Sequence, residues 1–159
     1  MLKMILLPVD GSEPSLRAVS FAAELAAELE ASILLLHVLE SLLARQQLKD
    51  YLTVLEEDPA SNEGEIESVR SALSKSGEDQ GKEILADAEQ LLRKRGVKDV
   101  STATHVGDPT TELLRLAETG KYDMIIMGRR GLGHLKGLFM GSVSHKISNL
   151  ADCPVVTVK

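Results

Sequence analysis

The chain has 159 residues, of which 43% are hydrophobic, 26% are charged and only 3% are aromatic, a composition that suits one globular domain with an aliphatic core. Its formal net charge of −6 argues against a general binder of nucleic acid or of anionic membranes, because such proteins carry a basic surplus. One cysteine excludes an intrachain disulfide, and we find neither a secretory leader nor an apolar run of the roughly 20 residues that cross a bilayer, so we expect a single cytoplasmic domain over residues 1–159.

Two continuous apolar runs near the start of the chain predict strands that are covered on both faces, as in a parallel sheet. They span Met4–Val9 and Ser32–Leu39, and between them apolar residues recur at helical spacing over Leu16–Leu29. Ser12 is available as the N-cap of this helix, and Pro14 is tolerated in its first turn. The three elements predict a βαβ unit.

The rest of the chain repeats this alternation. A long amphipathic helix is expected over Ile66–Leu91, although Gly77 and Gly81 weaken its middle, and Gly96 is a plausible stop. The later elements are a strand at Val97–Val106, a helix opened by Asp108 and Pro109 and ended by Gly120, a strand at Tyr122–Met127, a short helix with Val143, Ile147 and Leu150, and a strand at Pro154–Val158. Five strands alternating with four helices predict an α/β fold with right-handed crossovers.

The segment from Ser41 to Asn62 interrupts the alternation, because it is longer than a typical connection. Leu48, Leu52 and Leu55 stand at helical spacing within it, which predicts a short extra helix in this insertion, at about 41–62. Packing of the insertion on the domain and a role as a lid or partner surface both remain open.

Two of the predicted strands end in residues that suit a ligand site. Asp10-Gly11-Ser12 follows the first strand, and Gly128-Arg129-Arg130-Gly131 follows the fourth. Ligands of open parallel sheets bind beyond the carboxyl ends of the strands, so these two ends would form one pocket if their strands are neighbours. Backbone N–H groups of a glycine-rich turn, and the positive end of a helix that begins at Ser142, favour a phosphate.

The glycine-rich stretch fits neither of two common nucleotide motifs, since it lacks Gly-Lys-Ser/Thr and has Lys136 where GxGxxG requires a third glycine. Its own pattern is Gly128, two residues, Gly131, nine residues and Gly141-Ser142, which resembles the ATP-binding branch of the universal stress protein family. The segments ILLPVDGSEPS, LLHV, VGDP, YDMIIMG and CPVVTVK resemble that family in the same order, so the resemblance covers nearly the whole chain except the insertion.

The resemblance implies a doubly wound, five-stranded parallel sheet in the order 3-2-1-4-5 with helices on both faces, which makes the first and fourth strands neighbours. It also implies an ATP site. The adenosine would be lined by Pro8, Val9 and Asp10, with the Asp10 carboxylate on the ribose hydroxyls, by backbone groups of Val38 at adenine, and by Met127 and Gly128 on the ribose side. The phosphates would be surrounded by Arg130, Gly131, Gly141, Ser142, Val143 and Ser144.

The resemblance implies Mg²⁺ held mainly through phosphate oxygens and water, and it assigns no catalytic residue and no protein ligand for the metal. Asp10 has an alternative role, because Asp before Gly-Ser frequently only caps a turn. His37, His105, His134 and His145 lack a metal-ligand spacing, so we expect them to be ordinary surface or core histidines.

Two functions are consistent with such a site. In the first, ATP orders the Gly128–Gly141 loop of a regulatory stress-response protein and so changes a surface for an unknown protein partner. In the second, the protein is a slow Mg²⁺-dependent ATP hydrolase, although no residue that would orient water is evident. A flavin carrier is disfavoured because the chain has only two Phe and two Tyr. In the family, the strand at 154–158 pairs with its twofold mate, which implies a homodimer.

Overall fold

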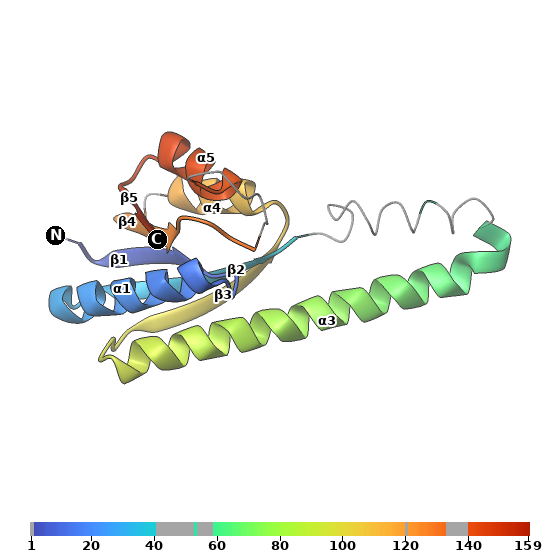
Figure 1. The fold of residues 1–159 in the computed structure, drawn as a ribbon, viewed down its shortest axis with the longest axis horizontal. Helices are drawn as coiled ribbons and strands as arrows, with labels where there is room; N and C mark the ends of the chain where they lie inside the picture. Colours follow the sequence, from blue (N-terminus) through green and yellow to red (C-terminus); the bar gives the residue numbers. More distant parts are fainter. Residues whose placement is uncertain (1, 41–52, 54–58, 120, 133–139) are drawn as a thin grey trace.

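The computed structural model describes residues 2–40, 53, 59–119, 121–132 and 140–159 (Figure 1). Within them lies one sheet of five parallel strands in the order β3-β2-β1-β4-β5. The strands are β1 (Met4–Pro8), β2 (Ser32–Leu39), β3 (Val100–Val106), β4 (Met124–Gly128) and β5 (Val155–Val158). The predicted fold class and strand order are confirmed, and β1 and β4 are neighbours.

Helices cover both faces of this sheet (Figure 1). One face carries α1 (Glu13–Leu29) and α3 (Pro59–Lys94), and the other carries α4 (Pro109–Ala117) and α5 (Ser142–Leu150). Each face has its own aliphatic core, because side chains of buried parallel strands point alternately to the two sides. Ile5, Leu7 and Ile33 pack toward α1 and α3, whereas Leu6, Leu36 and Ile125 pack toward α4 and α5.

The predicted helix starts are confirmed by their caps. The Ser12 side chain accepts from the Ser15 N–H at the start of α1, and the Asp108 side chain accepts from the Thr111 N–H at the start of α4. Residues 59–62, which we expected within the insertion, belong to α3. Most of the insertion, including its predicted extra helix, and the predicted stop at Gly120 lie outside the described residues.

Helix α3 is much longer than the sheet that it covers (Figure 1). Leu85, Ala88 and Leu92 are buried against the sheet in its carboxyl-terminal half, while its amino-terminal half extends beyond the strands. Gly77 and Gly81 do not interrupt this helix, contrary to the weakness that their low helix propensity predicted. None of the helices in the described part of the chain combines the length and the apolar character that spanning a membrane requires.

Asp123 ties the amino terminus to the start of β4, and it makes fold stability depend on pH. Its Oδ2 accepts from the N–H groups of Lys3 at 2.8 Å and Met4 at 2.9 Å, and these bonds lower the pKa of the carboxyl group from its usual 3.8. A lowered folded pKa contributes stability above the unfolded value, and this contribution is lost as the pH falls through the folded pKa.

We therefore expect Asp123→Asn to unfold at lower urea than the wild type at neutral pH, because the amide accepts these two backbone bonds without a charge. The difference should shrink when the titration is repeated below pH 3.8, where the wild-type carboxylate progressively protonates. An equal difference at both pH values would show that the Asp123 charge does not contribute to stability.

Candidate functional site

The turn that follows β1 is held by hydrogen bonds along its length. The Val9 N–H donates to a carbonyl of β2 at 2.9 Å, and the Asp10 N–H donates to Ser15 Oγ at 3.2 Å. Asp10 Oδ1 accepts from the Ser12 N–H at 2.9 Å, across Gly11, whose φ of 79° suits glycine. Asp10 therefore does cap the turn, as its alternative role predicted, and it uses only one carboxylate oxygen to do so.

The second oxygen of Asp10 faces the end of β4. A Cβ atom at Gly131 would lie only 2.6 Å from Asp10 Oδ2, so the two residues are in close contact. The fold thus brings the ends of β1 and β4 together at one edge of the sheet. A larger residue in place of Gly131 would occupy the space beside this carboxylate.

The amino terminus of α5 is fixed to the same edge. Arg129 O accepts from the Gly141 N–H at 2.9 Å and from Ser144 Oγ at 2.6 Å. Gly141 is the N-cap of α5, and no side chain in the described structure caps this helix. The N–H groups of Ser142 and Val143 lie in the first turn, where an α-helix offers them no acceptor. Such amides, at the positive end of the helix dipole, can donate to an anion.

Three predicted site residues serve the fold itself. Ser144 is 2% exposed, and its hydroxyl donates to the Arg129 and Gly141 carbonyls. The Met127 side chain is buried in the core toward α4 and α5, which leaves only its backbone for a ligand. A Cβ at Gly128 would lie 2.8 Å from backbone atoms of α1, so this glycine permits close packing of the helix.

The end of β2 lies beside the turn after β1. Val38 is half-buried and pairs with His105 of β3. The preceding residue, His37, is 8% exposed, and its Nδ1 lies 2.8 Å from Val9 O. Since a carbonyl oxygen only accepts, Nδ1 carries the proton in this hydrogen bond. His37 is therefore a core histidine, as expected, but one that contacts the candidate site.

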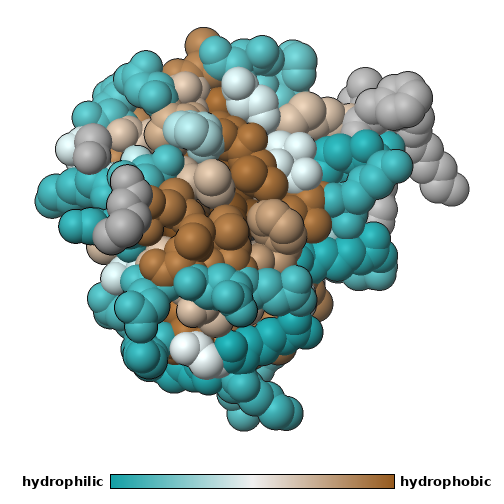
Figure 2. Space-filling model, turned by 90° about the vertical axis from the view of Figure 1, so that its left-hand side faces the viewer, coloured by the Kyte–Doolittle hydropathy of each residue, from teal (hydrophilic) through white to brown (hydrophobic). Residues whose placement is uncertain are grey.

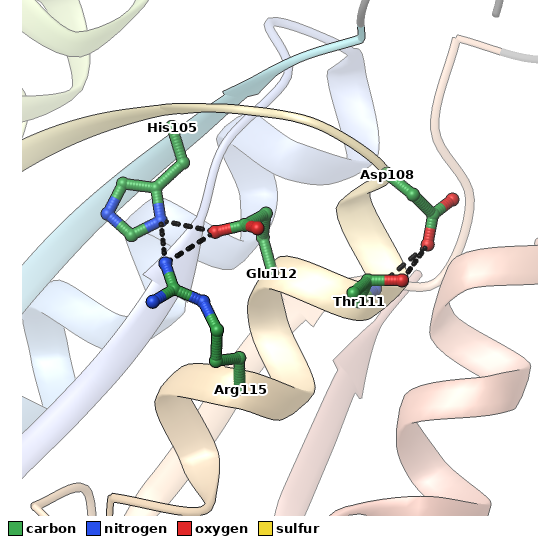
Figure 3. Close-up of polar contacts among 5 residues, drawn as sticks. All are labelled: His105, Asp108, Thr111, Glu112 and Arg115. Atoms are coloured by element: carbon green, nitrogen blue, oxygen red, sulfur yellow. Dashed lines mark hydrogen bonds and ion pairs between the residues drawn. The ribbon is translucent and has the colours of Figure 1, made fainter.

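A separate polar cluster lies at the end of β3 (Figure 3). Glu112 Oε2 accepts from His105 Nδ1 and from Arg115, both at 2.8 Å, and the Arg115 and His105 contacts lower the pKa of Glu112. Nearby, Asp108 Oδ1 accepts from the Thr111 N–H and hydroxyl. These side chains satisfy one another and cap α4, so we assign them a structural role. Among the described residues, no group of three His, Cys, Asp or Glu side chains could hold a metal ion.

A sequence model of the Universal stress protein family matches residues 1–159. The chain belongs to this family. Universal stress protein YxiE of Bacillus subtilis is 32% identical over 160 residues, an alignment that covers 100% of both chains. The family predicted from the motifs is thus confirmed, and the match also includes the region of the insertion, which the motif resemblance left out.

Solved structures of universal stress proteins share the fold. UspA from Lactobacillus plantarum superposes with a TM-score of 0.81 at 20% identity, covering 99% of this chain and 98% of that chain. The Archaeoglobus fulgidus protein in complex with dAMP has a TM-score of 0.65 at 18% identity and covers 100% of this chain and 98% of that chain. An Arabidopsis thaliana family protein with AMP bound has a TM-score of 0.63 at 21% identity, with 99% and 91% covered.

Sequence reasoning missed one residue at this edge of the universal stress protein fold. His37 was set aside because it matches no metal-ligand spacing, yet it contacts the turn that carries Asp10. The signal that could have identified it is the register of β1 and β2, which pairs Pro8 with Leu36 and so places the next residues, Val9 and His37, at the same level. A motif search within one segment does not reveal such a pairing.

Proposed function

We propose that the protein is a regulatory ATP-binding protein whose nucleotide lies at the carboxyl edge of the sheet. The observation that carries this proposal is the convergence at that edge of Asp10 Oδ2, Gly131 and the start of α5, which no described side chain caps. Carboxylate oxygens suit ribose hydroxyls, and helix amides suit phosphates, so the two ends of a nucleotide match the two sides of the site. The family members solved with dAMP and AMP support the adenine class.

In this proposal some of the site residues act through their side chains and others through their backbone. Asp10 would accept from the ribose through Oδ2 while Oδ1 keeps its bond to the turn. The amides of Ser142 and Val143 would donate to phosphate oxygens, with Arg130 and Gly131 beside them. The remaining predicted residues would act through their backbone or by shape: Pro8, Val9, Val38, Met127, Gly128, Gly141 and Ser144.

Mg²⁺ would enter with the triphosphate. The described residues offer no cluster of three metal-ligating side chains, and Mg²⁺ commonly keeps several waters and binds through substrate phosphates. When bound, the metal would neutralise charge on the phosphate oxygens. The protein itself would contribute the backbone amides of Ser142 and Val143 and the Arg130 guanidinium, which would surround the phosphate oxygens.

Calorimetric titration of nucleotide-stripped protein tests the proposal. We expect ATP with Mg²⁺ to bind near one nucleotide per chain and to be recovered without sustained hydrolysis, because the Asp10 carboxylate is assigned to the ribose and not to an attacking water. Sustained turnover would favour the alternative of a slow Mg²⁺-dependent ATP hydrolase. The absence of heat with ATP and with AMP would refute the proposed site.

Nucleotide occupancy would act as a signal through the turn from Gly128 to Gly141. The two ends of this segment are joined by the hydrogen bonds that Gly141 N–H and Ser144 Oγ donate to Arg129 O. Residues 133–139 between them lie outside the described structure. Phosphate contacts at both ends would order a glycine-rich backbone and offset the entropy that this ordering costs. An unknown protein partner would then bind to the surface that this ordering changes.

We also propose a homodimer through the strand at 154–158. β5 is the last strand in the sheet order, so its outer edge has no partner among the described strands. Its residues are half-buried, and Figure 2 shows apolar side chains gathered on the end of the molecule that includes β5. Light scattering should give twice the chain mass of 17.2 kDa, and the mass of one chain at micromolar concentration would contradict the dimer.

A further inference from the structure

About one helical turn apart, helix α3 contacts His37 of β2 and the turn after β1. A Cβ at Gly81 would lie 2.7 Å from His37 Cδ2 and 3.2 Å from its Nε2, so the helix backbone presses on the imidazole. A Cβ at Gly11 would lie 3.1 Å from Ile84 Cδ1, so the next turn of α3 packs on the glycine beside Asp10. The position of α3 and the shape of this turn are therefore coupled by direct contact.

His37 completes this connection by holding a single peptide unit. Its Nδ1–H donates to Val9 O at 2.8 Å, and the N–H of the same peptide, which belongs to Asp10, donates to Ser15 Oγ at 3.2 Å. Both sides of the peptide that precedes the Asp10 side chain are thus fixed. Val9 is 4% exposed, so loss of the imidazole donor would leave a buried acceptor that must reorient to find another partner.

We propose that His37 is a positioning residue for the nucleotide site and that it links the placement of α3 to nucleotide affinity. The inference rests on the proposed function, because Asp10 matters here as the ribose acceptor. Displacement of α3 moves the imidazole that Gly81 supports, and the Val9–Asp10 peptide follows. Thermodynamic linkage makes the effect reciprocal, so bound nucleotide stabilises the position of α3 in which it contacts His37 and Gly11. The amino-terminal half of this helix extends beyond the sheet (Figure 1).

Two pairs of variants test the linkage by nucleotide titration. His37→Leu removes the donor and should weaken binding about tenfold, whereas His37→Asn offers an N–H near the Nδ1 position and should stay within about threefold of the wild type. Gly81→Ala pushes on the imidazole and should also weaken binding. Gly77→Ala is its matched control, since among the described atoms a Cβ there meets only Leu39 Cδ2 at 3.7 Å, an ordinary contact.

The combination of His37→Asn with Gly81→Ala shows whether the imidazole carries the effect. Asparagine lacks the Cδ2 and Nε2 atoms that a Cβ at Gly81 would meet, so Gly81→Ala should have no further effect in that background. Urea unfolding of each variant separates loss of affinity from loss of fold. If His37→Leu does not fold, the Gly81→Ala and Gly77→Ala pair still decides the question.

The nucleotide-free protein provides a test that needs no ligand. Amide resonances of Asp10 and Gly11 should shift in Gly81→Ala and stay in place in Gly77→Ala. If these resonances shift but the wild type binds no adenine nucleotide, the proposed function is refuted, whereas the contact between α3 and the turn is supported. Wild-type binding with equal dissociation constants for Gly81→Ala and Gly77→Ala would overturn the linkage alone, as would unshifted Asp10 and Gly11 resonances.

Discussion

The double variant Gly131→Val/Gly141→Val is expected to lose adenine nucleotide affinity by more than about 100-fold and to keep its fold. A Cβ at Gly131 would stand 2.6 Å from Asp10 Oδ2, so the carboxylate must turn away from the place assigned to the ribose. A Cβ at Gly141 would lie 3.4 Å from Arg129 O and from Arg130 Cα, so valine would add bulk at the N-cap of α5, beside its first amides. Both halves of the proposed site are then obstructed.

The fold should survive these changes because neither Cβ forces the backbone to move: the atom nearest to a Cβ at Gly131 is a side-chain end, and a Cβ at Gly141 stands at the limit of ordinary contact with backbone. Asp10 Oδ2 is the far end of a side chain, and 3.4 Å is tight but not a clash. Calorimetry measures the affinity, and urea unfolding monitored by circular dichroism measures the stability. Gly64→Val is the matched control, since a Cβ at Gly64 meets no described atom within 4 Å, and it should bind like the wild type. Undiminished affinity in the double variant would reject the site.

The fold could be predicted from sequence because each element carries a local signal. The apolar run at Ser32–Leu39 matches β2 at both ends. The third strand was expected from Val97 but begins at Val100, because the Val97 N–H donates to Leu92 O and closes the end of α3 instead. Helix propensity alone could not predict that α3 continues through Gly77 and Gly81. A Cβ at Gly81 would collide with the imidazole of His37, which lies on another element, so this glycine reflects a tertiary contact and not a helix end.

The candidate site is a prediction of a different kind, because it rests on where residues stand at the ends of elements. Asp10, Gly131 and Gly141 stand at or beside the ends of elements, where spacing along the chain and the rules of parallel sheets together predict a ligand. The particular use of each residue depends on contacts across the fold. Ser144 was expected to contact phosphate, but its hydroxyl binds a backbone carbonyl at the end of β4. Only the contacts made in the folded structure distinguish a glycine that would leave room for a ligand from a glycine that permits a helix to pack closely.

Gly128 permits α1 to pack closely on β4. Among the glycines of the candidate site, Gly128→Ala should therefore be the most destabilising replacement by alanine. In a strand, replacing glycine with alanine usually stabilises, because alanine loses less conformational freedom on folding. Here the new Cβ would lie 2.8 Å from Pro14 C and from Ser15 N, which are backbone atoms in the first turn of α1. Backbone cannot turn aside as a side-chain end can, so overpacking should cost about 1–3 kcal/mol.

Thermal unfolding measures this cost directly, and a loss of that size should lower the Tm by roughly 2–12 °C for a chain of this length. Gly64→Ala is the control, since it adds the same methyl group in open surroundings and should leave stability unchanged or raise it by about 0.4–1 kcal/mol. Because Ser15 also accepts from the Asp10 N–H, a shift of this first turn should weaken nucleotide binding as well. A Gly128→Ala protein as stable as the wild type would mean that α1 can withdraw from β4 without cost, and the close packing inferred at this position would be wrong.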